Sequence, residues 1–168
     1  MLWVIGGGTM GRGIAEVFAQ AGWKVYMREV EPAALDRLRA LQEKYPNLQA
    51  GGEWPITPPS AYVHEAVPEN LALKKGVFSE LAFRIGTETI VATNTSALSV
   101  HELARELPYR EQLLGWHFFN PATRLALVEV IPTGFTASQV VERSLAILRE
   151  VGKEPIVAPD VPGFMRRR

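Results

Sequence analysis

The sequence predicts one α/β domain, a doubly wound and mostly parallel sheet with helices on both faces. Two observations carry this prediction. Short apolar runs alternate with longer segments whose apolar residues recur at helical spacing, and glycines stand at several of the junctions. Strands joined through helices run parallel and are buried on both faces. The chain of 168 residues is long enough for one hydrophobic core of ordinary size.

The N-terminal part of the chain predicts a β-α-β unit. Leu2 to Ile5 is a short apolar run that leads into glycines, and the helix that follows ends at Gly22. Lys24 to Arg28 is the second predicted strand, and Pro32 then opens a helix with leucines on one face. From Tyr45 to Ser60 the residues are mostly those of loops, so no regular structure is expected there.

The alternation continues through the second half of the chain. Strands are predicted at Tyr62 to Val67, Thr89 to Thr93, Gln112 to Phe119, Leu125 to Ile131 and Pro155 to Ala158. A helix with an apolar face lies between the first two. Ser99 and Glu102 have the spacing of a capping box, which predicts a helix start. Thr136 and Gln139 have the same spacing and predict another helix, which Gly152 would end.

Composition and charge exclude several classes of function. The 18 basic and 18 acidic residues cancel, so neither nucleic acid nor a membrane surface is expected as a general partner. The absence of cysteine excludes a disulfide scaffold and a thiolate nucleophile, and the three histidines lack metal-site spacing. Redox chemistry would therefore need an organic cofactor. The short apolar N-terminus does not resemble a signal sequence and nothing approaches a membrane span, so a cytoplasmic location is expected.

Gly6, Gly8 and Gly11 form a G-x-G-x-x-G motif directly after the first strand and at the start of the first helix. In that context the first glycine permits a tight turn and the second lets a pyrophosphate approach the backbone. The third allows the helix and the strand to pack closely. The amides at the helix N-terminus, around Thr9 and Met10, would receive the phosphate charge. The motif therefore predicts a Rossmann-type dinucleotide site.

Glu29 stands at the end of the second strand, about 20 residues after the glycines. A carboxylate there can accept both ribose hydroxyls of the adenosine and repel a 2′-phosphate, which predicts NAD as the cofactor. The neighbouring Arg28 leaves NADP open, because a guanidinium could pair with a 2′-phosphate. The plainer alternative is a glycine-rich turn without a ligand and a solvent-facing glutamate.

Further segments follow in a distinctive order. They are GGGTMG at Gly6 to Gly11, EAVPENLALKK at Glu65 to Lys75, TNTS at Thr93 to Ser96, GWHFFNP at Gly115 to Pro121, LVEVIP at Leu127 to Pro132 and DVPGF at Asp160 to Phe164. Together they closely resemble the NAD-binding domain of the L-3-hydroxyacyl-CoA dehydrogenase family. The resemblance implies an NAD-binding domain over residues 1–160, with residues 161–168 the start of the family's C-terminal helical domain, which is otherwise absent.

The resemblance also implies roles for the matching residues. His117 resembles the catalytic base and Glu129 its carboxylate partner, while Ser96 and Asn120 would lie around the substrate oxygen and the nicotinamide. Physical chemistry agrees, because oxidising a secondary alcohol needs a base for the hydroxyl proton and a histidine titrates near working pH. The residues at the family's remaining cofactor-contacting positions are Glu69, Lys74 and Asn94.

Each of these residues also has a plainer structural interpretation. A histidine in an apolar strand, such as His117, is often a core residue satisfied by a backbone carbonyl. Glu129 alone would be a surface charge on an edge strand and Lys74 a solvated helix residue. Ser96 and Asn120 would be turn or capping groups. The histidines expected to be purely structural are His64 and His101.

The chain also departs from the family pattern. Family members carry a long helical hairpin before the EAVPEN segment that contributes to the coenzyme A surface, and here that stretch is a Pro-rich loop. The family's second domain, which closes over the substrate, does not follow before the end at Arg168, and Arg167 stands where the family has an active-site asparagine. A site open to water would lose electrostatic strength and substrate positioning.

These observations leave three functions open. The leading hypothesis is an NAD-dependent 3-hydroxyacyl-CoA dehydrogenase of fatty-acid or related acyl-CoA metabolism, in which Glu129 orients His117 as the general base. The second is an NAD-binding module without independent activity, as a truncated relative or half of a two-chain enzyme. The third is a relative that acts on a small hydroxy acid. The expected partners are an acyl-CoA thioester and either further copies of the chain or a missing domain.

Overall fold

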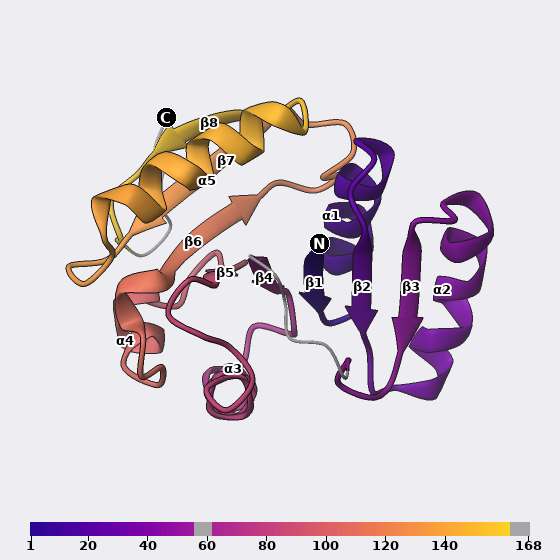
Figure 1. The fold of residues 1–168 in the computed structure, drawn as a ribbon, viewed down its shortest axis with the longest axis horizontal. Coiled ribbons are helices and arrows are strands. Elements are labelled where there is room, and N and C mark those ends of the chain that lie inside the picture. The colour runs from indigo at the N-terminus through magenta and orange to yellow at the C-terminus, as the bar shows by residue number, and fades with distance from the viewer. Residues whose placement is uncertain (56–61, 162–168) are drawn as a thin grey trace.

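Within the described residues, 1–55 and 62–161 of the chain, eight strands form one sheet. This description comes from a computed structural model. The strand order is β3-β2-β1-β4-β5-β6-β7-β8 (Figure 1). Neighbouring strands run parallel except β6 and β7, which are antiparallel. The predicted Rossmann-type, mostly parallel sheet is therefore confirmed. Residues 162–168, assigned from the sequence to the start of a second domain, lie outside the described residues.

Most strands lie where the sequence predicts them, with ends that differ by one or two residues. Their bounds are β1 Leu2–Ile5, β2 Val25–Arg28, β3 Leu48–Gly51, β4 Tyr62–Glu65, β5 Ile90–Thr93, β6 Leu113–Phe118, β7 Leu127–Pro132 and β8 Glu154–Val157.

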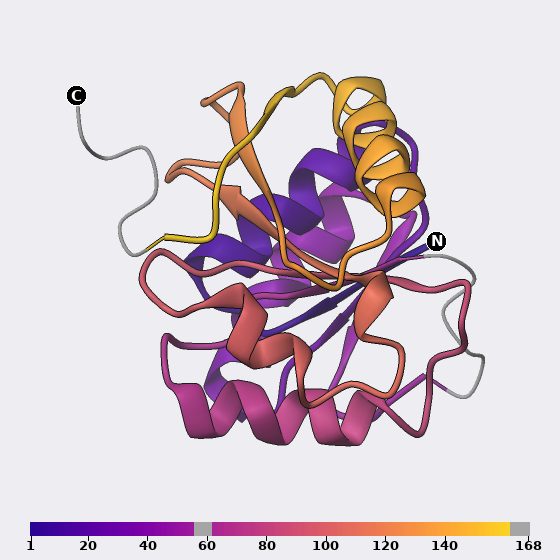
Figure 2. The ribbon, with the colours of Figure 1, turned by 90° about the vertical axis from the view of Figure 1, so that its left-hand side faces the viewer.

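Helices cover both faces of this sheet, as predicted. Their bounds are α1 Thr9–Gln20, α2 Pro32–Lys44, α3 Leu71–Leu81, α4 Val100–Ala104 and α5 Ser138–Glu150, with a 3₁₀ turn at Arg110–Gln112. Figure 2 shows α3 and α4 on one side of the sheet and α1 and α5 on the other. Within residues 1–55 and 62–161, no helix is long and apolar enough to cross a membrane.

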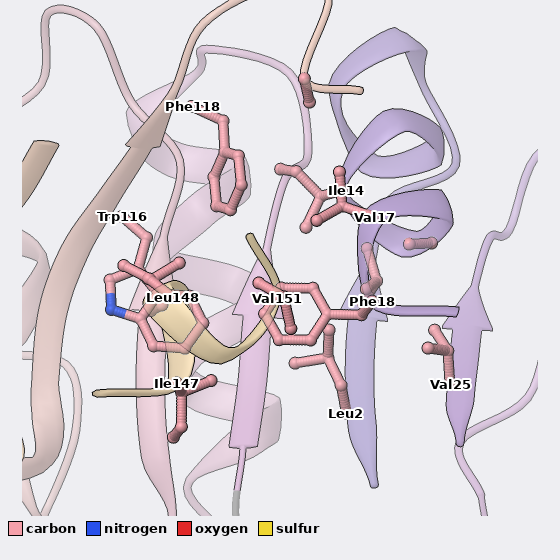
Figure 3. Packing of buried hydrophobic residues seen from close by; sticks show 14 of the residues in the cluster. Leu2, Ile14, Val17, Phe18, Val25, Trp116, Phe118, Ile147, Leu148 and Val151 are labelled. Carbon is pink, nitrogen blue, oxygen red and sulfur yellow. The ribbon is translucent and has the colours of Figure 1, made fainter. Parts of the chain in front are cut away.

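A hydrophobic cluster on each face holds the helices to the sheet. On one face, Phe18 of α1 stacks against Trp116 of β6, with ring centroids 6.2 Å apart and planes 4° from parallel, and Leu148 of α5 belongs to the same cluster (Figure 3). On the other face, Trp3 of β1 and Phe78 of α3 belong to a second cluster. Each fully buried side chain of this size stabilises the fold by about 1.5–3 kcal/mol.

The loop predicted for Tyr45 to Ser60 is wrong in its first part. Leu48–Gly51 forms β3, an edge strand that pairs in parallel with β2. Only the first residue of β3 is buried, so the segment lacks the alternation that marks a strand in a sequence. The residue before β3 holds the strand in place, because the side-chain amide of Asn47 donates to the carbonyl oxygens of Ala19 at 2.8 Å and Trp23 at 2.7 Å. Residues 56–60 of the predicted loop lie outside the described residues.

Of the two predicted capping boxes one forms, and the predicted glycine stop after α5 is confirmed. Ser99 caps α4 by accepting a hydrogen bond from the Glu102 amide at 3.3 Å. Gly152 ends α5 with a φ of +78°, a left-handed conformation that favours glycine. The capping box predicted at Thr136 is wrong, because α5 begins without a side-chain cap. The Thr136 hydroxyl instead donates to the carbonyl oxygen of Leu113 at 2.6 Å, which ties the turn to β6.

Candidate active site

The carboxyl ends of the central parallel strands open onto a cleft of about 690 Å³. Eight of the residues predicted to bind a cofactor line this cleft: Gly6, Gly8, Thr9, Met10, Glu29, Glu69, Asn94 and Ser96. The other two predicted cofactor residues, Gly11 and Lys74, are buried and do not line it. The fold thus brings together positions that are up to 90 residues apart in the chain.

The glycine turn has the geometry that a dinucleotide phosphate needs. Gly6 has a φ of +104°, and a Cβ there would lie 2.8 Å from the carbonyl oxygen of Ala66. A Cβ on Gly11 would lie 1.9 Å from the carbonyl oxygen of Gly6, so the third glycine lets α1 pack against the turn. A Cβ on Gly8 would have no atom within 4 Å, because this residue faces the open cleft. A phosphate can therefore approach the backbone of Gly8 and the N-terminus of α1.

Glu29 is fixed beside the glycine turn. One carboxylate oxygen accepts a hydrogen bond from the Gly7 amide at 2.6 Å, and the other accepts from the Glu31 amide at 2.8 Å. The carboxylate therefore lies at the cleft wall where the adenosine ribose of a dinucleotide would be held. Together with the exposed Gly8 backbone, this position fits NAD.

β6 and β7 bring the predicted base and its carboxylate partner together. His117 and Glu129 are paired in the antiparallel register, and Nδ1 of the ring lies 2.8 Å from Oε2 of the carboxylate. Nε2 of the ring lies 3.0 Å from the Ser96 hydroxyl oxygen. His117 is 6% exposed and Glu129 is fully buried, so the plainer interpretation of Glu129 as a surface charge is wrong. A carboxylate on Nδ1 keeps the proton on that nitrogen and leaves Nε2 to exchange one with a substrate.

Asn94 links the cleft to the strand that carries the histidine. Its side-chain oxygen accepts a hydrogen bond from the Phe118 amide at 3.0 Å, one residue beyond His117. Its backbone amide donates to the carbonyl oxygen of Glu65 at 2.8 Å, which anchors the turn after β5 to the end of β4. Asn94 therefore holds the backbone of β6 one residue beyond His117.

Glu69 organises the turn that presents Ser96. Its Oε1 accepts hydrogen bonds from the Thr95 hydroxyl, from the Ser96 amide at 3.1 Å and from the Ala97 amide at 3.0 Å. Burial opposes ionisation of this carboxyl, but the Thr95 hydrogen bond, the Lys74 charge and the two amides outweigh it and hold its pKa below the usual value. Glu69 therefore carries a negative charge at the cleft wall while it fixes the Ser96 hydroxyl.

Lys74 and Glu65 form a buried ion pair beneath the cleft. The ammonium lies 2.8 and 2.9 Å from the two carboxylate oxygens and also donates to the carbonyl oxygen of Asn94 at 3.0 Å. Both side chains are fully buried, so the plainer interpretation of Lys74 as a solvated residue is wrong. Sequence reasoning assigned no role to Glu65, whose signal in the sequence is a carboxylate at the end of a predicted strand.

Asn120 is placed apart from the other predicted catalytic residues. It is exposed beyond the end of β6 and lines a second hollow of about 420 Å³ between α1 and α2, not the cleft that Ser96 lines. Thr9 lines both the hollow and the cleft, so the two spaces adjoin. Hydrogen bonds among the described residues therefore join Ser96, His117 and Glu129. Asn120 lies apart from them, at the second hollow.

The sequence matches known proteins over most of its length. The family model for the 3-hydroxyacyl-CoA dehydrogenase NAD binding domain matches residues 2–53 and 57–161. The chain is 35% identical over 184 residues to 3-hydroxyadipyl-CoA dehydrogenase of Escherichia coli (strain K12), an alignment that covers 98% of this chain and 39% of that protein.

Solved structures agree with the sequence match. The 3-hydroxybutyryl-CoA dehydrogenase from Escherichia coli K12 has a TM-score of 0.89 and 34% identity, over 97% of this chain and 39% of that one. A 5-formyl-3-hydroxy-2-methylpyridine 4-carboxylic acid 5-dehydrogenase, described as an NAD⁺-dependent dismutase, has a TM-score of 0.90 and 31% identity, over 99% of this chain and 60% of that one.

The chain spans 39% of the length of its curated relative, and this chain contains the complete glycine turn and the residues around His117. The family match, the fold and the cleft that fits a dinucleotide agree with one another. The chain belongs to the 3-hydroxyacyl-CoA dehydrogenase family, in which it corresponds to the NAD-binding domain, and its cofactor is NAD.

Proposed function

We propose that this chain is the NAD-binding and base-carrying part of a 3-hydroxyacyl-CoA dehydrogenase, which interconverts a (3S)-3-hydroxyacyl-CoA and the 3-oxo thioester. The observation that carries the proposal is the array Ser96–His117–Glu129 beside the NAD cleft, with distances of 3.0 and 2.8 Å along it. A base next to a nicotinamide site is the arrangement that oxidation of a secondary alcohol requires.

The chain's own residues would handle the proton. When bound, NAD supplies the acceptor for the hydride that leaves C3 of the substrate. Nε2 of His117 takes the hydroxyl proton as the C3–O bond becomes a carbonyl, and it returns that proton in the reverse direction. Buried Glu129 holds the ring orientation and stabilises the imidazolium that forms. The Ser96 hydroxyl, 3.0 Å from Nε2, would position the substrate oxygen at the same point.

The second hollow favours a coenzyme A thioester over a small hydroxy acid. Its walls carry Arg12 and Arg37, and among the described residues neither guanidinium has an ion-pair partner. Lys44 also lines it and is paired with Glu16 at 2.6 Å. Arginine pairs readily with phosphate oxygens, so this surface between α1 and α2 suits the phosphates of a thioester carried on coenzyme A.

A second candidate is a module that holds NAD but turns over only with further protein. The chain covers 39% of its curated relative and 60% of the pyridine carboxylic acid dehydrogenase. Substrate contacts from outside this chain would then be needed for turnover. This candidate requires the same NAD cleft and differs only in activity.

The test compares two oxidants for NADH, acetoacetyl-CoA and free acetoacetate, by the loss of near-ultraviolet absorbance. The proposal predicts turnover with the thioester and a much weaker reaction with the free acid. In Arg12→Gln/Arg37→Gln the KM for acetoacetyl-CoA should rise about tenfold or more. Arg39→Gln, on α2 like Arg37 but outside the hollow, serves as the control. Faster reaction with acetoacetate would favour a small acid, and NADH binding without turnover would favour the module.

A further inference from the structure

Arg28, the last residue of β2, and Glu29, which follows it, have different partners. Glu29 contacts the glycine turn through the Gly7 amide. Arg28 instead points towards α3, where Nη2 lies 3.7 Å from Oε2 of Glu80 and the side chain is 16% exposed. Its Cζ lies 4.3 Å from the centroid of the Trp54 ring. The guanidinium is thus paired with a carboxylate and stacked on an indole.

Trp54 and Glu80 contact each other in addition to contacting Arg28. The indole Nε1 donates to Oε2 of Glu80 at 2.7 Å, the same oxygen that faces Arg28. Arg84 places its Cζ 4.8 Å from the Trp54 ring. The Tyr26 hydroxyl donates to the carbonyl oxygen of the residue before Trp54 at 2.9 Å, which fixes this segment against β2. We call Trp54 and Glu80 the arginine latch.

The latch lies at the adenosine end of the cofactor cleft. Arg28, Glu29 and Glu80 line one hollow of about 350 Å³, which shares Gly6 and Glu29 with the dinucleotide cleft. A 2′-phosphate on the adenosine ribose would enter beside Glu29. Arg28 lines the same hollow as Glu29, so its guanidinium could pair with this phosphate if it were free to turn. The arginine latch instead holds the guanidinium against Glu80 and Trp54.

We propose that the arginine latch withholds Arg28 from a 2′-phosphate and so makes this site select NAD over NADP. An arginine can bind a phosphate through paired charge-assisted hydrogen bonds, which offsets the repulsion from a nearby carboxylate. Here the guanidinium would first have to leave Glu80 and the Trp54 ring. NADP then meets the charge of Glu29 without a compensating cation. The proposal rests on the NAD site and is independent of the acyl-CoA chemistry.

The test is a set of dissociation constants for NADH and NADPH, measured by nicotinamide fluorescence on Glu29→Gln, Glu80→Gln and the double variant. Removing Glu29 removes the repulsion, and removing the Glu80 charge frees Arg28. The double variant should bind NADPH at least about tenfold more tightly than Glu29→Gln alone. Adding Arg28→Met to the double variant should abolish the gain, and added salt should shrink it.

Two further variants separate selectivity from folding. Trp54→Leu in the Glu29→Gln background opens the latch from its other side and should also raise NADPH affinity. Glu106→Gln breaks a comparable ion pair of α3, with Lys75 at 2.7 Å, and should leave the ratio of NADPH to NADH affinity unchanged. The proposal would be overturned if Glu29→Gln, Glu29→Gln/Glu80→Gln and Glu29→Gln/Trp54→Leu all bound NADPH with equal affinity while their melting curves showed that each is folded. Failure of the parent chain to bind NADH would instead contradict the cofactor itself.

Discussion

Glu129 of β7 lies directly opposite His117 of β6, with its carboxylate 2.8 Å from the ring Nδ1 and no exposure to solvent. The antiparallel pairing of β6 and β7 produces this contact, because it brings two residues twelve positions apart onto neighbouring strands. A buried carboxylate in this position acts on a ring that gains charge during proton transfer. The negative charge of Glu129, and not only its hydrogen bond, should therefore affect the reaction.

Replacing Glu129 with Gln should lower kcat for acetoacetyl-CoA reduction by roughly 10²–10³-fold, since the amide keeps a hydrogen bond to Nδ1 but no longer stabilises the imidazolium. The NADH dissociation constant should stay within about twofold, because Glu129 does not line the cofactor cleft. Steady-state kinetics and a fluorescence titration measure the two quantities. An unchanged kcat in a folded Glu129→Gln variant would mean that the carboxylate has no electrostatic part in the reaction.

Gly8 and Gly11 should separate binding from stability. Gly11→Ala places a Cβ 1.9 Å from the Gly6 carbonyl oxygen, so it should lower the free energy of unfolding by at least about 2–3 kcal/mol. Gly8→Ala meets no atom within 4 Å and should leave stability nearly unchanged. Its methyl group should nevertheless weaken NADH binding about tenfold, because it stands where a phosphate approaches. Denaturation and fluorescence titration of this pair check both statements, and the reverse pattern would contradict the assignment of the turn.

Lys74→Met should destabilise the fold by about 3–5 kcal/mol, because it leaves the fully buried Glu65 carboxylate without its ammonium partner. Burial already raises the pKa of Glu65 despite Lys74, so loss of the cation should drive it further towards the protonated form. Glu65→Gln/Lys74→Met should recover part of the loss. Urea denaturation of the single and double variants gives the coupling energy, and additive effects would show that the two groups are independent.

His64 should make the fold less stable in acid. It is completely buried between the rings of Trp116 and Phe118, and burial, with a smaller contribution from the Lys74 charge, lowers its pKa from 6.5 to about 3. Below pH 6.5 the unfolded chain therefore binds a proton that the folded chain excludes, and stability is lost as the pH falls towards 3. Between pH 7 and pH 5 this loss amounts to about 2 kcal/mol.

The replacement His64→Phe removes that proton and retains an aromatic ring. The free energy of unfolding of the variant should consequently fall by about 2 kcal/mol less than that of the parent over the same pH interval. Urea denaturation at the two pH values provides the comparison. An equal fall in both proteins would show that His64 does not contribute to the acid sensitivity.

Sequence patterns were sufficient for seven of the eight strands of the described sheet and for the dinucleotide turn. The motif from Gly6 to Gly11 combines a strand, a turn and a helix start. Gly6 and Gly11 have no room for a Cβ, whereas Gly8 faces the open cleft. Local patterns failed where tertiary contacts decide the structure. β3 has a single buried side chain and depends on Asn47, and Thr136 bonds to β6 instead of capping α5.

The family resemblance implied the residue types of the candidate site and the partnership of His117 with Glu129, but local sequence patterns do not specify these connections. The pairing of His117 with Glu129 depends on the register of two strands, which apolar composition alone does not specify. The burial of Lys74 depends on Glu65 and on the turn at Asn94, so no local pattern marks it. Asn120 shares the motif of His117 but lies at the neighbouring hollow, because β6 ends between them.

The role of His117 as the base of a dehydrogenase whose cofactor is NAD is tested most directly by the rate of NADH oxidation by acetoacetyl-CoA in the parent chain and in His117→Gln, with the NADH dissociation constant of each. We expect turnover in the parent, a fall of at least about 10²-fold in the variant, and similar NADH affinity in both. Equal turnover in the two proteins, at equal NADH affinity, would contradict the assignment of His117 as the base.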